Sequence, residues 1–156
     1  MLIWRICPES YGSKAFTGSG GLQYGARWHQ KARIVYASEN LSLAALEFFV
    51  NLNPDQCSVA LVAVSAAIPK SVRIITVRPL DLPSDLRKYP APAALQRIGT
   101  EWIRSGNSAV LAVPSALVPT ERNFLLNPGH PHFAAIIINQ PEPFYFDGRM
   151  WKAKRR

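Results

Sequence analysis

Residues 25–51 read GARWHQKARIVYASENLSLAALEFFVN, and here a glycine-containing turn, a strand and a helix follow one another directly. Arg33 to Ser38 alternates between two faces, which predicts a strand. The run from Leu41 to Asn51 predicts a helix, and Ser38 or Asn40 is available as its N-cap. The rest of the fold has to be built around this strand and helix.

Short strands dominate the remainder of the chain. Runs rich in apolar and β-branched residues predict strands at Leu2–Ile6, Ser58–Val64, Val72–Val77, Ala109–Val113, Ala134–Ile138 and Phe144–Phe146. Two of these runs, Ala109–Val113 and Ala134–Ile138, are continuously apolar, which predicts burial on both faces.

A second helix is expected from Ala93 to Arg104, ending at Gly106. Gly- and Pro-containing stretches predict loops at Pro8–Tyr24 and Pro79–Pro92. With no internal repeat and no linker, the predicted fold class is α+β, a single compact domain in which β-structure dominates.

Composition limits the class of protein. The chain has 156 residues, 48% of them hydrophobic, and two cysteines, Cys7 and Cys57. This length suits one domain over residues 1–156, and the apolar content is too high for a disordered chain. Two cysteines without a CxxC pair form no disulfide framework and indicate no zinc or redox centre. Neither a secretory leader nor a membrane helix is expected, so we expect a cytoplasmic protein.

Charge gathers at the C-terminus. The formal net charge is +8, and five basic residues between 149 and 156 accompany Asp147. A basic tail beside Trp151 suits contact with nucleic acid or with an acidic partner. We favour a solvated, frayed terminus, because no zinc-finger spacing, zipper repeat or RNA-recognition motif accompanies the charges.

Glu47 is the residue in the first helix that does not fit its surroundings. Leu43, Leu46, Glu47 and Val50 share one helical face, so a carboxylate stands in an apolar stripe. Its burial is costly unless the group is paired or hydrogen-bonded. Either Glu47 serves a functional site, or it reaches solvent from the edge of the stripe or pairs with a structural arginine.

Two further groups of residues suit ligand binding. Arg27 follows small residues and can approach a phosphate closely, while Trp28 and Tyr36 offer aromatic walls for a planar ring. Ser115 closes an apolar strand and Asn123 follows it, and strand ends often carry polar site residues. Taken singly, each also has an ordinary structural interpretation as a surface, core, turn or capping residue.

The sequence lacks the motifs of several well-known types of catalytic and metal site. Ser115 has no GxSxG elbow, and there is no P-loop and no GxGxxG. His29, His130 and His132 lack the spacing of a metal site. We therefore expect no metal.

Five short motifs occur in the order in which the RES-domain family carries them. They are Gly25-x-Arg27-Trp28, Tyr36-Ala37-Ser38, Leu43-Ala44-x-Leu46-Glu47, Val113-Pro114-Ser115 and Asn123-x-Leu125-x-Asn127-Pro128. From about Ile3 to Phe146 the chain therefore resembles this family, which is named for its arginine, glutamate and serine. Its members are mostly toxins of bacterial toxin–antitoxin pairs.

The resemblance implies a compact relative of the ADP-ribosyltransferase fold, with a split β core around a cleft that binds NAD. It implies that NAD is a substrate, cleaved between nicotinamide and ribose by hydrolysis or phosphorolysis without a metal. Arg27, Glu47 and Ser115 match the family's three named positions, and Tyr36 and Asn123 match further polar site positions. It also implies an Xre-like, helix-turn-helix antitoxin over the cleft, so that DNA is contacted only through this partner.

These residue types suit that chemistry. Cleavage develops oxocarbenium character on the ribose, which the carboxylate of Glu47 would stabilise. Arg27 would hold the pyrophosphate, Tyr36 would stack on the nicotinamide or its ribose, and Ser115 and Asn123 would position the dinucleotide.

Three alternatives remain at this point. The protein could transfer ADP-ribose to a target protein, it could be a basic nucleic-acid-binding or ribonuclease-type toxin that uses its tail, or its cleft could be inactive. The acceptor of the ADP-ribose and the oligomeric state are not fixed by the sequence.

Overall fold

The computed structural model describes residues 1–53 and 58–154, with side chains up to residue 151. The strands are β1 (Leu2–Pro8), β2 (Val35–Ser38), β3 (Leu61–Ala67), β4 (Ile74–Thr76), β5 (Val110–Pro114), β6 (Arg122–Leu126), β7 (Ile137–Ile138) and β8 (Glu142–Phe144). The α-helices are α1 (Ser19–Gln23), α2 (Leu41–Val50) and α3 (Ala93–Ser105). Short 3-10 helices are η1 (Glu9–Lys14), η3 (Pro79–Asp81), η4 (Pro131–Ala135) and η5 (Gly148–Lys154).

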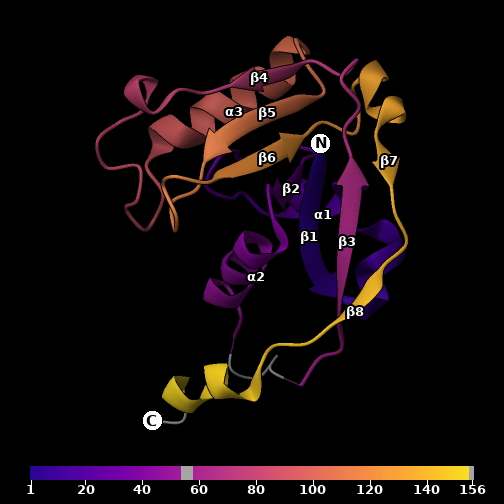
Figure 1. Cartoon of the computed structure of the whole chain (residues 1–156). Coiled ribbons are helices and arrows are strands. Elements are labelled where there is room, and N and C mark those ends of the chain that lie inside the picture. Colours follow the sequence, from indigo (N-terminus) through magenta and orange to yellow (C-terminus); the bar gives the residue numbers. More distant parts are fainter. Residues whose placement is uncertain (54–57, 155–156) are drawn as a thin grey trace.

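The strands form one sheet that opens in its middle. Their order is β4-β5-β6-β2-β1-β3-β7, with β8 also paired to β3. β1 pairs with β3 along its whole length, but it meets β2 only at Trp4 and Ser38. Beyond that point the β1–β3 half and the β2–β6–β5 half run in clearly different directions, with α2 beside the junction (Figure 1).

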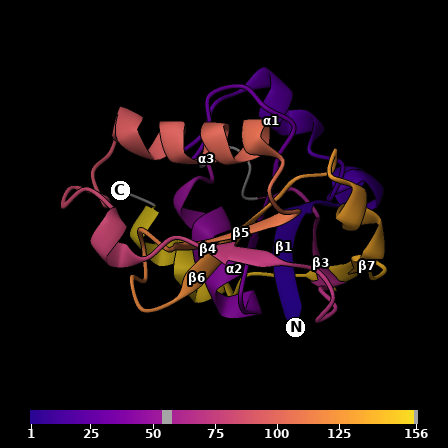
Figure 2. The ribbon, with the colours of Figure 1, turned by 90° about the horizontal axis from the view of Figure 1, so that it is seen from above.

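Each half of the sheet has its own helix. Ala44 of α2 packs on Ile6 and Ala63 of the β1–β3 half, whereas Leu95 and Trp102 of α3 pack on the β5–β6 half. Figure 2 shows α3 running along the β4–β5 side of the sheet. The opposite face of the sheet is covered in part by the N-terminal segment, whose Phe16 enters the largest core cluster. This largest cluster contains residues of both halves, so one core joins them on this face while a separate helix packs on each half of the other face.

The expected β-rich α+β architecture is present, but several details of the prediction are wrong, among them the strand expected at Phe144–Phe146, which is β8 at Glu142–Phe144. The strand expected at Ser58–Val64 begins at Leu61, because Ser58 lies in a turn and Val59 in a bend. The loop predicted at Pro8–Tyr24 contains η1 and α1, and β6 was not predicted at all. α3 does stop at Gly106, whose left-handed conformation (φ 60°) suits glycine at a helix C-cap.

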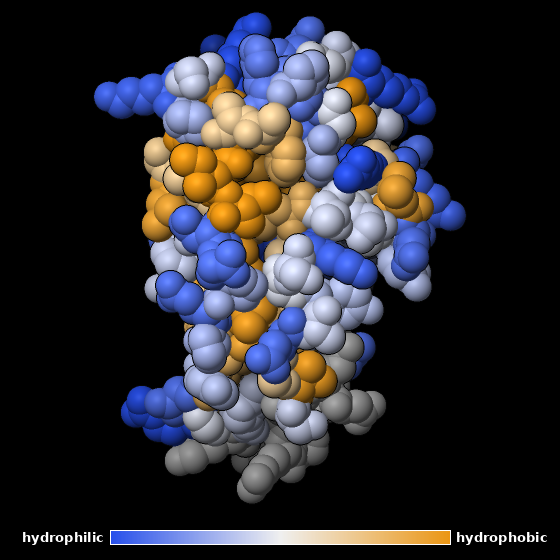
Figure 3. All heavy atoms as spheres, turned by 90° about the vertical axis from the view of Figure 1, so that its right-hand side faces the viewer, coloured by the Kyte–Doolittle hydropathy of each residue, from blue (hydrophilic) through white to orange (hydrophobic). Residues whose placement is uncertain are grey.

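The run Ala134–Ile138 is the largest error. Ala134 and Ala135 belong to η4, and β7 holds only Ile137 and Ile138, which are 64% and 44% exposed instead of buried on both faces. Strand β7 lies at the edge of the sheet and pairs with β3 alone. Figure 3, which views the molecule from this side, shows hydrophobic residues gathered on the surface.

The C-terminal segment packs on the domain as far as Trp151, which corrects the expectation of a frayed terminus. The ring of Trp151 lies 5.4 Å from that of Phe49 and 5.8 Å from that of Phe146. Arg149 pairs with Asp147 at 2.8 Å. The side chains of residues 152–154, and residues 155 and 156 entirely, lie outside the described part of the chain.

Two further expectations concern the cysteines and the membrane. Cys7 is buried with a free thiol, and burial raises the pKa of that thiol. Cys57 lies outside the described residues. Within residues 1–53 and 58–154, no helix is long and apolar enough to cross a membrane.

Candidate active site

A cleft of about 880 Å³ opens where the two halves of the sheet separate. This volume is within the range of roughly 300–1,000 Å³ that is usual for small-molecule and cofactor sites. Arg27, Tyr36, Glu47 and Asn123 all line it, although they are far apart in the sequence. The structure thus brings four of the five predicted site residues to one cavity, with Ser115 just behind it.

Helix α2 carries Glu47 to the cleft, but not on the face that was predicted. Leu43 and Ala44 are the buried residues of α2, whereas Leu46 and Val50 are 42% and 58% exposed. The apolar stripe predicted through Leu46 and Val50 is therefore wrong. Glu47 lies four residues after Leu43, at the border between the buried face and the cleft.

Two donors hold the carboxylate of Glu47 by one oxygen. The Ser115 hydroxyl donates to Oε1 at 2.8 Å, and Nδ2 of Asn123 donates to the same atom at 2.6 Å. Among the described residues, Oε2 has no hydrogen-bond partner. One oxygen is thus fixed by the protein, and the other is available to a ligand in the cleft.

Ser115 faces Glu47 and not the cleft. The residue is fully buried, and its Oγ accepts hydrogen bonds from the backbone N–H groups of Leu117 and Val118, each at 3.1 Å. A hydroxyl that accepts twice and donates once has no capacity left for a substrate. The geometry therefore makes Ser115 a positioning residue for Glu47, in place of the expected contact with the dinucleotide.

Asn123 is oriented in the same way. The hydroxyl of Ser38 donates to its Oδ1 at 2.7 Å, which leaves the amide nitrogen to face Glu47. Ser38 and Asn123 lie opposite each other on β2 and β6. Ser38 was considered as an N-cap for α2, but Asn40 takes that position and accepts from the N–H of Leu43 at 2.7 Å.

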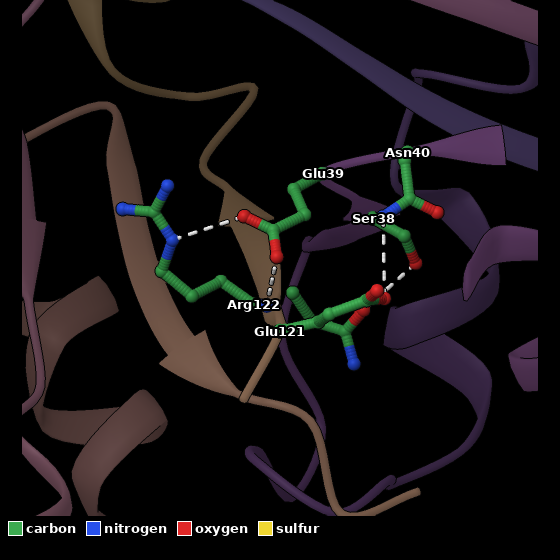
Figure 4. Close-up of polar contacts among 6 residues, drawn as sticks. Ser38, Glu39, Asn40, Glu121 and Arg122 are labelled. Carbon is green, nitrogen blue, oxygen red and sulfur yellow. Dashed lines mark hydrogen bonds and ion pairs between the residues drawn. The ribbon is translucent and has the colours of Figure 1, made fainter. Parts of the chain in front are cut away.

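Polar contacts fasten the start of α2 to the start of β6 (Figure 4). Glu39 accepts from the backbone N–H of Arg122 at 2.9 Å and pairs with its guanidinium at 3.1 Å. Asn40 donates to Glu121 at 3.2 Å. Because Asn123 follows Arg122 directly, this connection sets the distance between Glu47 and its donors.

Tyr36 lines the cleft, but its hydroxyl is bound to groups of the protein on the side away from the cleft. The hydroxyl lies 2.8 Å from Nδ1 of His29 and accepts from the N–H of Trp28 at 3.2 Å. Nε2 of His29 lies 3.3 Å from the carbonyl of Gly21, which can only accept, so Nδ1 is the nitrogen that accepts from Tyr36. Burial raises the pKa of Tyr36 and lowers that of His29. Tyr36 therefore offers the cleft its ring and not an acidic hydroxyl.

Arg27 lines the cleft while one of its nitrogens serves the protein. Its Nη1 donates to the carbonyl of Leu86 at 2.7 Å and to that of Lys88 at 3.1 Å. Among the described residues, its Nε and Nη2 groups form no hydrogen bond. The guanidinium thus holds a loop at the mouth of the cleft and keeps donors for an anion.

Arg5 also lines the cleft, although nothing in the sequence singled it out. Its Nη1 crosses the opening of the sheet to the carbonyl of Tyr36 at 3.1 Å, and its Nε is buried without a hydrogen-bond partner in the described part of the chain. Burial lowers the pKa of this guanidinium. The partly buried guanidinium adds a positive charge to the lining of the cleft, which suits an anionic ligand.

Comparison with known proteins identifies the family. A family model described as RES domain matches residues 2–147. The chain belongs to the RES domain family. The resemblance carried by its five motifs is confirmed.

Relatives of this RES domain are named as toxins. "Toxin Res" of Yersinia enterocolitica is 39% identical over 96% of this chain and 99% of its own length. "Prs ADP-ribosylating toxin" of Sphingobium is 32% identical over 95% of each chain. In the crystal structure of the M. tuberculosis MbcT–MbcA toxin–antitoxin complex, one chain matches with a TM-score of 0.69 and 14% identity, over 92% of this chain and 84% of that one. The expected fold class, an α+β domain with a split sheet of the ADP-ribosyltransferase kind, is confirmed.

The charged residues of the RES cleft leave it positive. In the described residues, the ionisable side chains that line it, apart from tyrosines, are Arg5, Arg27, Arg87 and Glu47. No group of three or more His, Cys, Asp or Glu residues that could hold a metal ion occurs among residues 1–53 and 58–154. The cleft combines a fixed carboxylate with several guanidinium groups, which suits an anionic substrate that develops positive charge in one part.

Proposed function

We propose that this RES domain is a toxin that degrades NAD by cleaving the bond between nicotinamide and ribose. The observation that carries the proposal is the carboxylate of Glu47, held through Oε1 by Ser115 and Asn123 with Oε2 open to the cleft. The toxin names of the relatives over nearly their whole length support it.

Glu47 supplies the electrostatic part of this reaction. As the bond breaks, nicotinamide leaves with the bonding electron pair, and positive charge develops on the ribose ring. A carboxylate fixed beside the ribose stabilises that charge without having to reorganise. Oε2 of Glu47, the oxygen open to the cleft, can also accept a proton from an attacking water. Ser115 and Asn123 act through Glu47 by holding it in place.

The arginines account for the anionic part of the substrate. Within the described residues, the Nε and Nη2 groups of Arg27 are unused donors, and pyrophosphate oxygens are suitable acceptors. Arg5 adds a positive charge to the lining of the cleft. The side chain of Tyr36 lies at the cleft with its hydroxyl committed elsewhere, so it would contact the nicotinamide or its ribose through its ring. No metal takes part in this scheme.

The acceptor of the ADP-ribose distinguishes two forms of the proposal. Water or phosphate gives an NAD glycohydrolase or phosphorylase, whereas a protein acceptor gives an ADP-ribosyltransferase. The printed name of the Sphingobium relative favours the second form. Incubation with NAD labelled in its adenine distinguishes them: label recovered only in small molecules supports degradation, and label on a protein band supports transfer.

The partner proposed for this toxin is an antitoxin that covers the cleft. The structural match to a chain of a toxin–antitoxin complex supports a protein partner of that kind. We further propose that the antitoxin is Xre-like, with a helix-turn-helix domain that contacts DNA on behalf of the pair, and that both act in the cytoplasm, where NAD is available.

Expression in bacterial cells tests the proposed function. The wild-type chain should deplete cellular NAD and arrest growth, and Glu47→Gln should leave NAD at its normal level because the negative charge is lost. Glu101→Gln is a matched control, since Glu101 carries the same charge on the exposed surface of α3 and does not line the cleft. Unchanged NAD with well-expressed, folded wild-type protein would contradict the proposal.

A further inference from the structure

The segment between β4 and α3 forms part of the cleft wall. Within it, residues 82–91, here called the cleft loop, contribute Arg87, Tyr89 and Ala91 to the lining. Leu82 and Leu86 anchor the loop by packing against the core cluster under α3. This is the stretch expected from the sequence to be a plain connection.

The cleft loop is fastened to both sides of the cavity. On one side, Arg27 donates to the carbonyls of Leu86 and Lys88 at 2.7 and 3.1 Å. On the other, Nε of Arg87 donates to the carbonyl of Ala116 at 2.9 Å, directly after the serine that holds Glu47. The loop thus spans the cleft from the Arg27 turn to the Glu47 side.

Two side chains of the loop are left to face a ligand. Tyr89 lines the cleft but is 88% exposed, so little of its ring packs against the protein. Arg87 uses only Nε for the bond to Ala116 among the described residues, and its terminal nitrogens remain. An exposed aromatic ring binds a planar base by stacking, and a guanidinium binds phosphate through paired donors.

We propose that the cleft loop is part of the substrate site, where Arg87 binds a phosphate and Tyr89 stacks on an aromatic ring of the same nucleotide. This rests on the proposed function, because a dinucleotide supplies both groups. Arg27 then has a second role, since it positions the loop through the carbonyls of Leu86 and Lys88. Sequence position alone does not link Arg87 and Tyr89 to Glu47, because Arg87 follows Glu47 by 40 residues.

Binding of NAD to the Glu47→Gln protein, measured by isothermal titration calorimetry, tests the proposal without turnover. In this background Arg87→Gln keeps an N–H donor for Ala116 but removes the charge, and Tyr89→Ala removes the ring. Each should raise the Kd for NAD about tenfold, as expected for one charge-assisted or stacking contact. Tyr89→Phe should retain the affinity of the parent.

Matched controls lie in the same chain. Lys88→Gln removes a positive charge from the same loop, but the Lys88 side chain does not line the cleft and sits by Asp85. Tyr145→Ala removes a tyrosine that is 81% exposed elsewhere. Both should bind NAD like the parent, and circular dichroism should show the same fold for all variants.

The outcomes separate this proposal from the one on which it rests. If the parent binds NAD and both Arg87→Gln and Tyr89→Ala bind it equally well, the role of the loop is overturned while the cleft stays an NAD site. If the parent does not bind NAD, both proposals are overturned. Titration with AMP and with nicotinamide mononucleotide then shows which half of NAD Tyr89 contacts: the affected half loses affinity in Tyr89→Ala.

Discussion

At the scale of single residues, the carboxylate of Glu47 is held in place by neighbouring polar side chains. Ser115 and Asn123 donate to the same oxygen, and Ser38 fixes the orientation of Asn123. A carboxylate bound this way on one side has little freedom to rotate, so its second oxygen is pre-organised. Such pre-organisation is the usual origin of electrostatic stabilisation in enzymes.

Replacement of Ser115 tests this positioning role. Ser115→Ala removes a donor to Glu47 and leaves two backbone N–H groups without their acceptor, so the free energy of unfolding should fall by about 1–3 kcal/mol. The kcat for NAD cleavage should fall while KM changes little, because Ser115 does not line the cleft. Urea unfolding and steady-state kinetics measure both effects, with the exposed Ser10→Ala as control. An unchanged kcat would refute the role.

The contact between His29 and Tyr36 predicts a dependence on pH. Burial lowers the pKa of His29 in the folded state, so its neutral form contributes stability that is fully present above the unfolded value of about 6.5. This stability is lost as the pH falls through the lower folded value, when Nδ1 takes up a proton and no longer accepts from Tyr36. Urea unfolding at pH 7.5 and pH 5 should show a smaller loss for His29→Asn than for the wild type. Equal losses would exclude His29 as the cause.

Not all of these residues could be found from the sequence. Glu47 stood out because a carboxylate occurred among apolar residues, although the face assigned to it was wrong. Leu46 and Val50 fit a buried stripe by spacing, but no element packs over them in the described structure. Nothing in the sequence marked Arg5 as a site residue, because a single arginine in an apolar strand is typical of an ordinary edge strand. Its place in the cleft follows only from the opening of the sheet beside it.

At the scale of elements, the approach of α3 to the turn after Arg27 fixes one wall of the cleft. Gly99 allows this approach: a Cβ at that position would lie 1.7 Å from the carbonyl oxygen of Trp28. Gln96 of the same helix donates to the carbonyl of Ala26 at 3.1 Å. The Gly25–Trp28 segment is thus held by α3 on one side and by Tyr36 on the other.

Gly99→Ala should displace this wall. The added methyl group has no space, so the free energy of unfolding should fall by about 1–3 kcal/mol. The rate of NAD cleavage should also fall, because the displaced wall moves Arg27. Gly20→Ala in α1 is the control, since a Cβ there meets nothing within 4 Å. Thermal unfolding and activity assays compare the two variants. A Gly99→Ala protein as stable as Gly20→Ala would contradict this close packing.

The elements that carry the site were predictable to different degrees. β2 was predictable from the alternation of its residues, and α2 from its N-cap and helical spacing. β6 did not, because its five residues begin with Arg122 and Asn123 and follow a turn, so the polar start hid a central strand. Its pairing with β2 and β5 comes from tertiary contacts that no local pattern reports.

At the scale of the whole molecule, the opening of the sheet between β1 and β2 creates the cleft. Each half has its own packed helix and both halves share the largest core cluster, so the sheet can diverge while its apolar residues stay buried. The C-terminal segment contributes to the β1–β3 half, where Phe146 and Trp151 pack on Phe49 of α2. The expected fraying of the chain end is therefore wrong as far as Trp151, which supports the helix that bears Glu47, whereas Arg149 is solvated as expected.

The proposed activity of the whole molecule depends on the carboxylate of Glu47 acting on NAD in the cleft. The most direct measurement is the rate of nicotinamide release from NAD by the purified protein, followed by liquid chromatography, for the wild type and for Glu47→Gln at equal thermal stability. The wild type should release nicotinamide, and Glu47→Gln should be slower by a factor on the order of 10²–10³, typical for the loss of one pre-organised electrostatic contact. Equal rates for the two proteins, or no release by the folded wild type, would contradict the account.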